Sequence, residues 1–191
     1  RLVESNLART EVEAPRLASS APDGVTVRSL QEAIASDPGL LEGKLGLAGE
    51  PEHFAALNTA LFSDGLWIDV PAGGAIETPI EIAHSLGAPG VVYPRVLVTV
   101  GEGAQLTLVE TYEAGGAEHL TNSLVEVDLS PNSAVNHVRV HENQGLQVGR
   151  VDVRQAADSR YRSTVITLGG ALLRFDVRCL LQGKGAECQL D

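Results

Sequence analysis

Short runs of alternating apolar and polar residues fill the chain after Gly65, and each run ends in a turn-forming cluster. The run GLWIDV places Leu66, Ile68 and Val70 on one face of a strand, as a period of two requires. Similar runs follow: VLVTV, LTLVETY, SLVEVDL, AVNHVRV, LQVGRVDVRQ, STVITL, ALLRFDVRCLL and ECQL. The clusters between them lie at 72–74, 101–103, 113–117, 130–133 and 182–185. This pattern predicts a continuous series of strands.

The residues before Gly65 carry helical patterns instead. Ser29 followed by Glu32 is typical of a helix N-terminus, and this helix should end near the Asp-Pro-Gly sequence at 37–39. A second helical pattern covers residues 52–62 and stops before a strong Asp-Gly turn. We therefore expect a partly helical N-terminal segment.

A turn-plus-strand unit recurs at nearly constant spacing through the strand region. Its equivalent positions are Ala75, Ala104, Ala134, Arg160 and Ala186, so successive steps are 29, 30, 26 and 26 residues. Such a repeat is typical of stacked coils that bury their apolar faces against their neighbours, whereas a sandwich has no reason to keep a step. We predict a right-handed parallel β-helix, an all-β core over residues 65–191, after the partly helical segment at 1–64.

The same alignment predicts which side chains point into the coil, because successive strand residues alternate between faces. Arg160 breaks this alternation, and a buried Asn136 would need partners such as a stacked amide ladder. His137 and His141 are expected on the outer surface. The predicted inward set is Ala104, Leu106, Leu108, Ala134, Asn136, Val138, Ala186, Cys188 and Leu190.

Composition narrows the class of protein. Apolar residues make up 43% and aromatic residues 4%, which suits thin β layers built from valine, leucine, isoleucine and alanine. The formal charge of -11, without a basic cluster, disfavours nucleic acid and anionic membranes as partners. Two cysteines favour a reducing cytoplasm over a disulfide framework. No apolar run approaches a membrane span and no signal peptide is recognisable. The absence of methionine and the stop at Asp191 suggest a piece of a longer protein.

The histidines do not form a ligand set in the sequence. On a strand, His137 and His141 lie about 14 Å apart, which is too far for one metal ion. His84, His119 and His53 have no partner at ligand spacing, and we interpret them as structural or exposed.

The cysteines and acids leave alternatives open. Cys188 falls in the inward set and Cys179 lies near Arg174 and Arg178, so inert packing, redox use and metal use all remain.

Four acidic residues could suggest acid–base chemistry, namely Glu110, Glu113, Glu126 and Asp128. The last two share a strand face about 7 Å apart, within the range for inverting glycosidases. Alternation with apolar residues favours a solvated sheet face. We therefore assign no catalytic, cofactor or metal residue.

Several stretches together resemble the SufB/SufD family of iron–sulfur cluster assembly proteins, from about Ala56 to Asp191. They are ALNTALFSDGLWIDVPAG, TPIEIAH, YPRVLVTVGEGAQLTLVETY, HLTNSLVEVDLSPNSAVNHVRV, VRQAADSRYRSTVITLGGALLRFDV and LQGKGAECQLD. The PRVLVTVGEGA and QAADSRYRS stretches look closer to the SufD branch.

The resemblance implies a right-handed parallel β-helix with helical flanks, in a non-enzymatic scaffold subunit that acts with SufB and the ATPase SufC in a SufBCD complex. It also implies that the ATPase-docking region and a proposed cluster-ligand histidine follow Asp191, so no ligand is assigned to His137 or His141. A transient iron–sulfur cluster is expected only in the full complex.

Two other functions fit a β-helix. One is a polysaccharide lyase or hydrolase, which the scarcity of aromatic residues disfavours. The other is a structural module that forms homodimers through an unpaired strand edge at its last coil.

Overall fold

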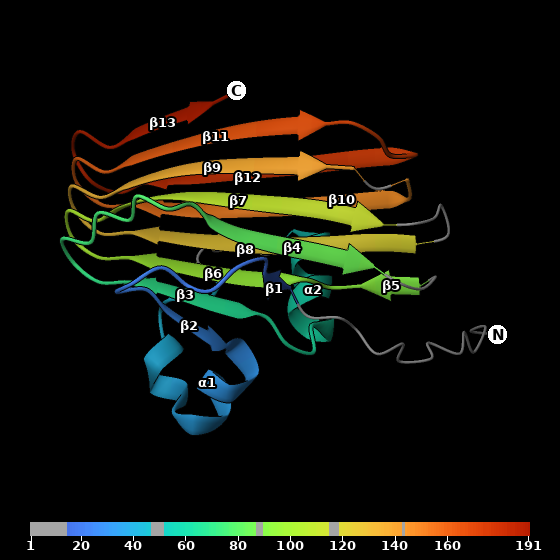
Figure 1. Cartoon of the computed structure of the whole chain (residues 1–191), viewed down its shortest axis with the longest axis horizontal. Helices are drawn as coiled ribbons and strands as arrows, with labels where there is room; N and C mark the ends of the chain where they lie inside the picture. The colour runs from blue at the N-terminus through green and yellow to red at the C-terminus, as the bar shows by residue number, and fades with distance from the viewer. Residues whose placement is uncertain (1–14, 47–51, 87–89, 115–118, 143) are drawn as a thin grey trace.

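The computed structural model describes residues 15–46, 52–86, 90–114, 119–142 and 144–191, and it is a parallel β-solenoid (Figure 1). Two sheets lie face to face, and the chain passes from one to the other in every coil. The first sheet, called the groove sheet below, has the order β1-β4-β7-β9-β11-β13. Its strands are β1 Arg16–Leu17, β4 Ile80–Leu86, β7 Gln105–Ala114, β9 Ala134–His141, β11 Arg160–Thr167 and β13 Glu187–Leu190.

The second sheet, called the helix sheet, has the order β12-β10-β8-β6-β3-β2. Its strands are β2 Thr26–Ser29, β3 Leu66–Val70, β6 Arg95–Val100, β8 His119–Leu129, β10 Leu146–Gln155 and β12 Leu172–Leu181, and β5 Gly90–Val92 adds to β8. Among the described strands, only two pairings are antiparallel: that of β1 with β4 and that of β2 with β3. All other pairings are parallel, as stacked coils require, which confirms the predicted solenoid.

The N-terminal helices form where the sequence predicts them. Helix α1 spans Leu30–Ser36, with the Ser29 hydroxyl accepting a hydrogen bond from the Glu32 amide at 3.0 Å. A 3-10 helix at Pro38–Leu41 (η1) follows, and helix α2 spans His53–Leu61. Both helices lie beside the helix sheet (Figure 1). No helix in the described part of the chain has both the length and the apolar character to span a bilayer.

A four-residue turn carries the chain from the helix sheet to the groove sheet in each coil. Its third residue has a positive φ, at Gly73, Gly103, Asn132, Asp158 and Gly185. Glycine, asparagine and aspartate are the residues that adopt this conformation at least cost. Successive turns are also joined to each other, for example by the Gly73 amide, which donates to the Glu102 carbonyl at 2.8 Å. Each turn therefore fixes the position of the next.

These turns, and not the alanines, set the register. The observed column is Ala75, Gln105, Ala134, Arg160 and Glu187. Each member lies two residues after a positive-φ position. The predicted column was wrong by one residue at Ala104 and Ala186, which instead occupy the corner just before the strand.

The shift reverses the predicted orientation of β9. Val135, His137 and Arg139 are buried, whereas Asn136 is exposed and Ala134 and Val138 lie on the outer side with it. The prediction for Ala104, Leu106 and Leu108 is confirmed, since all three are buried. Cys188 and Leu190 lie opposite the inward-facing Tyr161 and Ser163, as expected for the inner face. Arg160 is no exception to the pattern, because Tyr161 is the inward residue.

The core between the sheets is aliphatic near the turns. Valine, leucine and isoleucine from successive coils stack there, including Ile68, Val98, Leu106, Val127 and Val153. A second small cluster holds α1 against the helix sheet through Leu30, Trp67 and Leu97. Farther along the strands of the groove sheet, the interior becomes polar.

Candidate functional site

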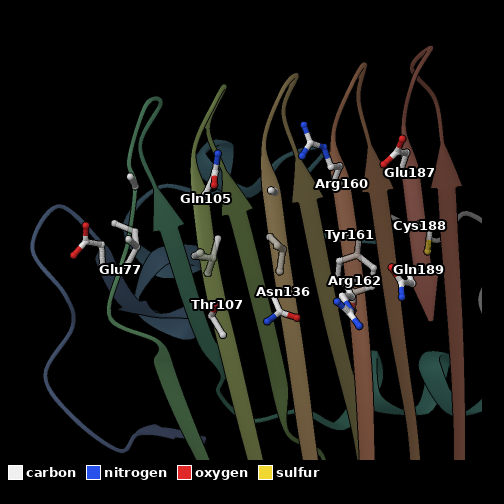
Figure 2. Close-up of a pocket in the computed structure, with 15 residues that line it drawn as sticks. Glu77, Gln105, Thr107, Asn136, Arg160, Tyr161, Arg162, Glu187, Cys188 and Gln189 are labelled. Carbon is white, nitrogen blue, oxygen red and sulfur yellow. The ribbon is translucent and has the colours of Figure 1, made fainter. Parts of the chain in front are cut away.

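A groove crosses the outer face of the groove sheet close to the turns, with a volume of about 680 Å³ (Figure 2). Each of five coils contributes three consecutive residues to it. We call this feature the outer groove. Its residues are 75–77, 105–107, 134–136, 160–162 and 187–189.

The side chains that point outward in the outer groove are mostly polar and carry both signs of charge. Figure 2 shows Thr107, Asn136 and Arg162 on successive strands in one row. Arg162 holds Asp191 through an N–O contact of 2.9 Å, and its side chain remains 58% exposed. An open, polar, mixed-charge surface suits recognition of another macromolecule through hydrogen bonds and ion pairs better than enclosure of a small substrate.

A second polar feature lies inside the solenoid, and we call it the interior cluster. It consists of His84, Glu110, Tyr112, His137, Arg139, His141 and Tyr161. The parallel register places most of them in two adjacent rows, with Glu110 and Arg139 in one row and three stacked rings in the next. His84, Tyr112 and His141 are direct partners on β4, β7 and β9. Their rings stack in that order with centroids 4.2 and 4.9 Å apart.

Glu110 is the centre of the interior cluster and is completely buried. Its carboxylate lies 3.4 Å from His84 Nε2 and 3.2 Å from His137 Nε2, and it accepts a hydrogen bond of 3.1 Å from the Tyr112 hydroxyl. The other nitrogen of His137 lies 2.8 Å from the Tyr161 hydroxyl. The carboxylate therefore has polar partners on several sides, as a buried charge requires.

The charge of Glu110 has a buried counterpart in Arg139, its direct register partner on β9. The Arg139 guanidinium donates to Ser163 Oγ at 2.9 Å and lies 4.1 Å from the centroid of the Phe175 ring. Two opposite charges thus occupy neighbouring places in the interior. The low dielectric there strengthens their attraction.

Burial shifts the titration of these groups. Burial alone would raise the pKa of Glu110, but hydrogen bonds and charge from His137 and His84 outweigh it and hold that pKa below its ordinary value. Burial lowers the pKa of His137 and of His141. Burial also raises the pKa of Tyr112, and the Glu110 charge adds to this effect. These shifts favour an ionised Glu110 beside uncharged His137, His141 and Tyr112 at neutral pH.

We expect the protein to lose stability as the pH falls below about 6.5, the ordinary pKa of histidine. The folded-state pKa of His141 is lower than this value, so the unfolded chain takes up the proton first and acid favours unfolding. Glu110 acts in the same direction at lower pH. Its contribution to the free energy of unfolding is fully present above pH 4.5, the ordinary pKa of its carboxyl group, and is lost as the pH falls through its lower folded-state pKa.

Urea denaturation above and below pH 6.5 measures this loss. His141→Gln should reduce the difference between the two conditions, whereas His53→Gln, at an exposed position on α2, should leave it unchanged. An unfolding midpoint that is equal at both pH values in the wild type would contradict the expectation.

The structure corrects the prediction for His137 and His141, which are buried in the interior cluster and not on the surface. His84 and His119 are also buried, and His53 is exposed, as the structural or exposed interpretation allowed. A strand alignment based on the positive-φ turn residues would have placed His137 and His141 correctly on the inner face.

The predicted acidic residues separate into different environments. Glu110 is inside the solenoid and Glu113 is exposed. Glu126 is buried on the outer side of the helix sheet, where Arg95 Nη2 contacts its Oε2 at 2.5 Å. Asp128 pairs with Arg154 and is partly exposed. The solvated-face interpretation was therefore wrong for Glu110 and Glu126, whose charges are balanced by specific partners.

The cysteines lie on facing strands of the last coil, and both are free and partly exposed. In the described part of the chain, no three histidine, cysteine, aspartate or glutamate side chains are placed to hold a metal ion together. The described residues therefore form a parallel β-solenoid with a polar groove on its outer face and a buried polar cluster in its interior.

Two known protein families match this chain. The family described as "SUF system FeS cluster assembly, SufBD core domain" matches residues 83–191, and the "SufBD protein N-terminal region" matches residues 9–82. The chain belongs to the SufBD family of iron–sulfur cluster assembly proteins.

Individual relatives agree with this assignment. An iron–sulfur cluster assembly SufBD family protein of Synechocystis is 27% identical over 183 residues, which cover 88% of this chain and 40% of that protein. Protein ABCI7, chloroplastic, of Arabidopsis thaliana is 27% identical over 171 residues, covering 83% and 36%. SufB of Bacillus subtilis is 28% identical over 141 residues, covering 70% and 30%. The chain spans at most 40% of the length of these relatives.

Proposed function

We propose that this chain forms the rigid core of a scaffold subunit for iron–sulfur cluster assembly, without catalytic activity of its own, that acts with SufB-like and SufC-like subunits. The observation that supports it best is the match of the SufBD core family to residues 83–191, the part that forms most of the solenoid. Within the family we assign the chain to the SufD branch, on the PRVLVTVGEGA and QAADSRYRS stretches. A cytoplasmic location is part of the same proposal.

The outer groove is the proposed docking surface. Helices α1 and α2 lie beside the helix sheet, so that face is already partly occupied (Figure 1). The groove sheet instead presents exposed polar residues from successive coils, with Arg160 and Arg162 on one strand. The two arginines lie two residues apart on the same face of β11, and Arg162 remains largely exposed although it pairs with Asp191. Such exposed cationic side chains suit an acidic or hydrogen-bonding partner surface.

Co-purification tests the proposal. The chain is co-expressed with the SufB-like and SufC-like proteins of the same organism and isolated through an affinity tag under reducing conditions. We expect a complex in the wild type and a loss of several-fold in partner recovery for Arg160→Glu/Arg162→Glu. Arg28→Glu, an exposed arginine on β2 of the other sheet, is the matched control and should retain the complex.

The two parts of the proposal can fail separately. No complex with the wild-type chain would contradict the scaffold function. A complex that survives the double charge reversal would contradict the groove as its docking surface while leaving the scaffold function in place.

A further inference from the structure

Two thiols meet across the interior of the last described coil. Cys179 lies on β12 of the helix sheet and Cys188 on β13 of the groove sheet, with their Sγ atoms 2.9 Å apart. Each pairs in register with a residue of the preceding coil, Val153 and Tyr161 respectively. The cysteines thus occupy the positions where the previous coil places an inward valine and an inward tyrosine.

Comparison with the earlier coils shows what the thiols add. Val127 with Val135, and Val98 with Leu106, hold the same two positions in lower coils and belong to the aliphatic core. Packing alone would therefore be satisfied by any apolar pair. Only in this coil do both sheets contribute a sulfur, and the sulfurs need to approach by only about 0.9 Å to reach the length of a disulfide bond.

We propose that Cys179 and Cys188 are a redox-modification site at which a low-molecular-weight disulfide, such as oxidised glutathione, forms a reversible bond between the two sheets. The Cys188 residue borders the outer groove, but its thiol points to the interior, toward Cys179 (Figure 2). Both cysteines are nevertheless partly exposed, so a small oxidant can reach the pair from solvent.

The reaction takes two exchange steps. The Cys188 thiolate attacks one sulfur of oxidised glutathione, which forms a mixed disulfide and releases one glutathione thiolate. Cys179 then loses its proton and attacks the Cys188 sulfur, which breaks the mixed disulfide and releases the second glutathione. In total, the two protein thiols lose two electrons and two protons, and one oxidised glutathione becomes two reduced molecules.

The environment of Cys179 limits its reactivity. Burial raises the pKa of Cys179 to about 12, and its contact with Cys188 adds to the effect. Its thiolate is therefore scarce at neutral pH, which slows any step in which Cys179 is the attacking group. Higher pH should accelerate ring closure.

The bond would close a short loop and hold the last coil together. The loop runs from Cys179 to Cys188 and contains the turn at 183–186. By the chain-entropy model, a loop of this size should raise the melting temperature by about 5 °C.

Intact mass spectrometry after oxidation tests the proposal. The 191-residue chain is incubated with defined ratios of oxidised to reduced glutathione, quenched with acid and alkylated with a maleimide. The wild type should lose both free thiols, form no disulfide-linked dimer, carry no glutathione and yield a linked peptide that contains both cysteines. Adding a reductant should restore both thiols and the lower melting temperature.

Two single variants identify the steps. Cys179→Ser lacks the resolving thiol and should accumulate the glutathione adduct at Cys188, whereas Cys188→Ser should react more slowly. Two free thiols in the wild type under strongly oxidising ratios, a persistent glutathione adduct, or a disulfide between two chains would each overturn the proposal. The wild-type measurement decides the matter even where a variant fails to fold.

Discussion

Gly101→Ala is expected to lower the free energy of unfolding by about 3 kcal/mol, whereas Gly103→Asn, two residues later in the same turn, should cost less than about 1 kcal/mol. A methyl group at Gly101 would lie 2.4 Å from the Ala72 amide nitrogen and 2.7 Å from its Cα. These are backbone atoms of the turn below, so relief requires that stacked turns separate.

Gly103 differs because its constraint is conformational and not steric. It has a φ of 68°, and an added Cβ would meet no atom within 4 Å. Asn132 and Asp158 adopt φ values of 59° and 56° at the equivalent turn positions. Asparagine should therefore be tolerated there.

Urea denaturation followed by far-ultraviolet circular dichroism measures both variants. The difference between the two losses in free energy of unfolding tests the stacking of the turns, so it matters more than either loss alone. Equal losses would mean that the turns do not rest on each other as the structure places them.

The second large effect is expected at a buried ion pair beside α2. Arg95→Met should lower the free energy of unfolding by about 3–5 kcal/mol, because it leaves the Glu126 carboxylate buried without its main counter-charge. Arg95 is 2% exposed. It also donates to Asn58 Oδ1 at 3.2 Å and to Thr59 Oγ1 at 2.8 Å, so the substitution loosens the contact between the helix and the sheet.

A matched pair in the same sheet supplies the control. Arg154 contacts Asp128 at 2.5 Å, but both side chains are about a quarter exposed, at 29% and 23%. Arg154→Met should therefore cost no more than about 1 kcal/mol.

The double variant Arg95→Met/Glu126→Leu tests the cause, since it removes both charges and should recover most of the loss. Failure to recover would show that the contacts of Arg95 with α2, and not its charge, carry the effect.

Features that depend on residues close together in the sequence were predictable, whereas features that depend on contacts between coils were not. The α1 N-terminus was predictable because Ser29 and Glu32 are three residues apart and their hydrogen bond is local. The repeat was also visible, because every coil needs a turn residue that tolerates a positive φ. The predicted register was wrong at Ala104 and Ala186, because a small residue at a corner resembles a small residue at the start of a strand.

This error of one residue also placed residues of the candidate site on the wrong face of the sheet. A shift of one residue moves a whole strand to the opposite face, so His137 and His141 were expected outside although they are inside. An alignment on the turns would have paired Tyr112 with His141, since each lies seven residues after its column member, Gln105 and Ala134. His84 lies nine residues after Ala75, because two extra residues precede β4, so the repeat alone does not place it in the stack. The outer groove was missed because its residues come from five coils.

By itself, the sequence determined the kind of fold, since alternation, turn residues and a steady repeat are local signals that every coil must satisfy. It also carried the resemblance that the SufBD family matches confirm. Only the tertiary structure decided which face of each strand is buried, which charges neutralise each other and that Cys179 meets Cys188. These facts depend on how one coil lies on the next, and the hydrogen bonds between neighbouring turns fix that position to the single residue.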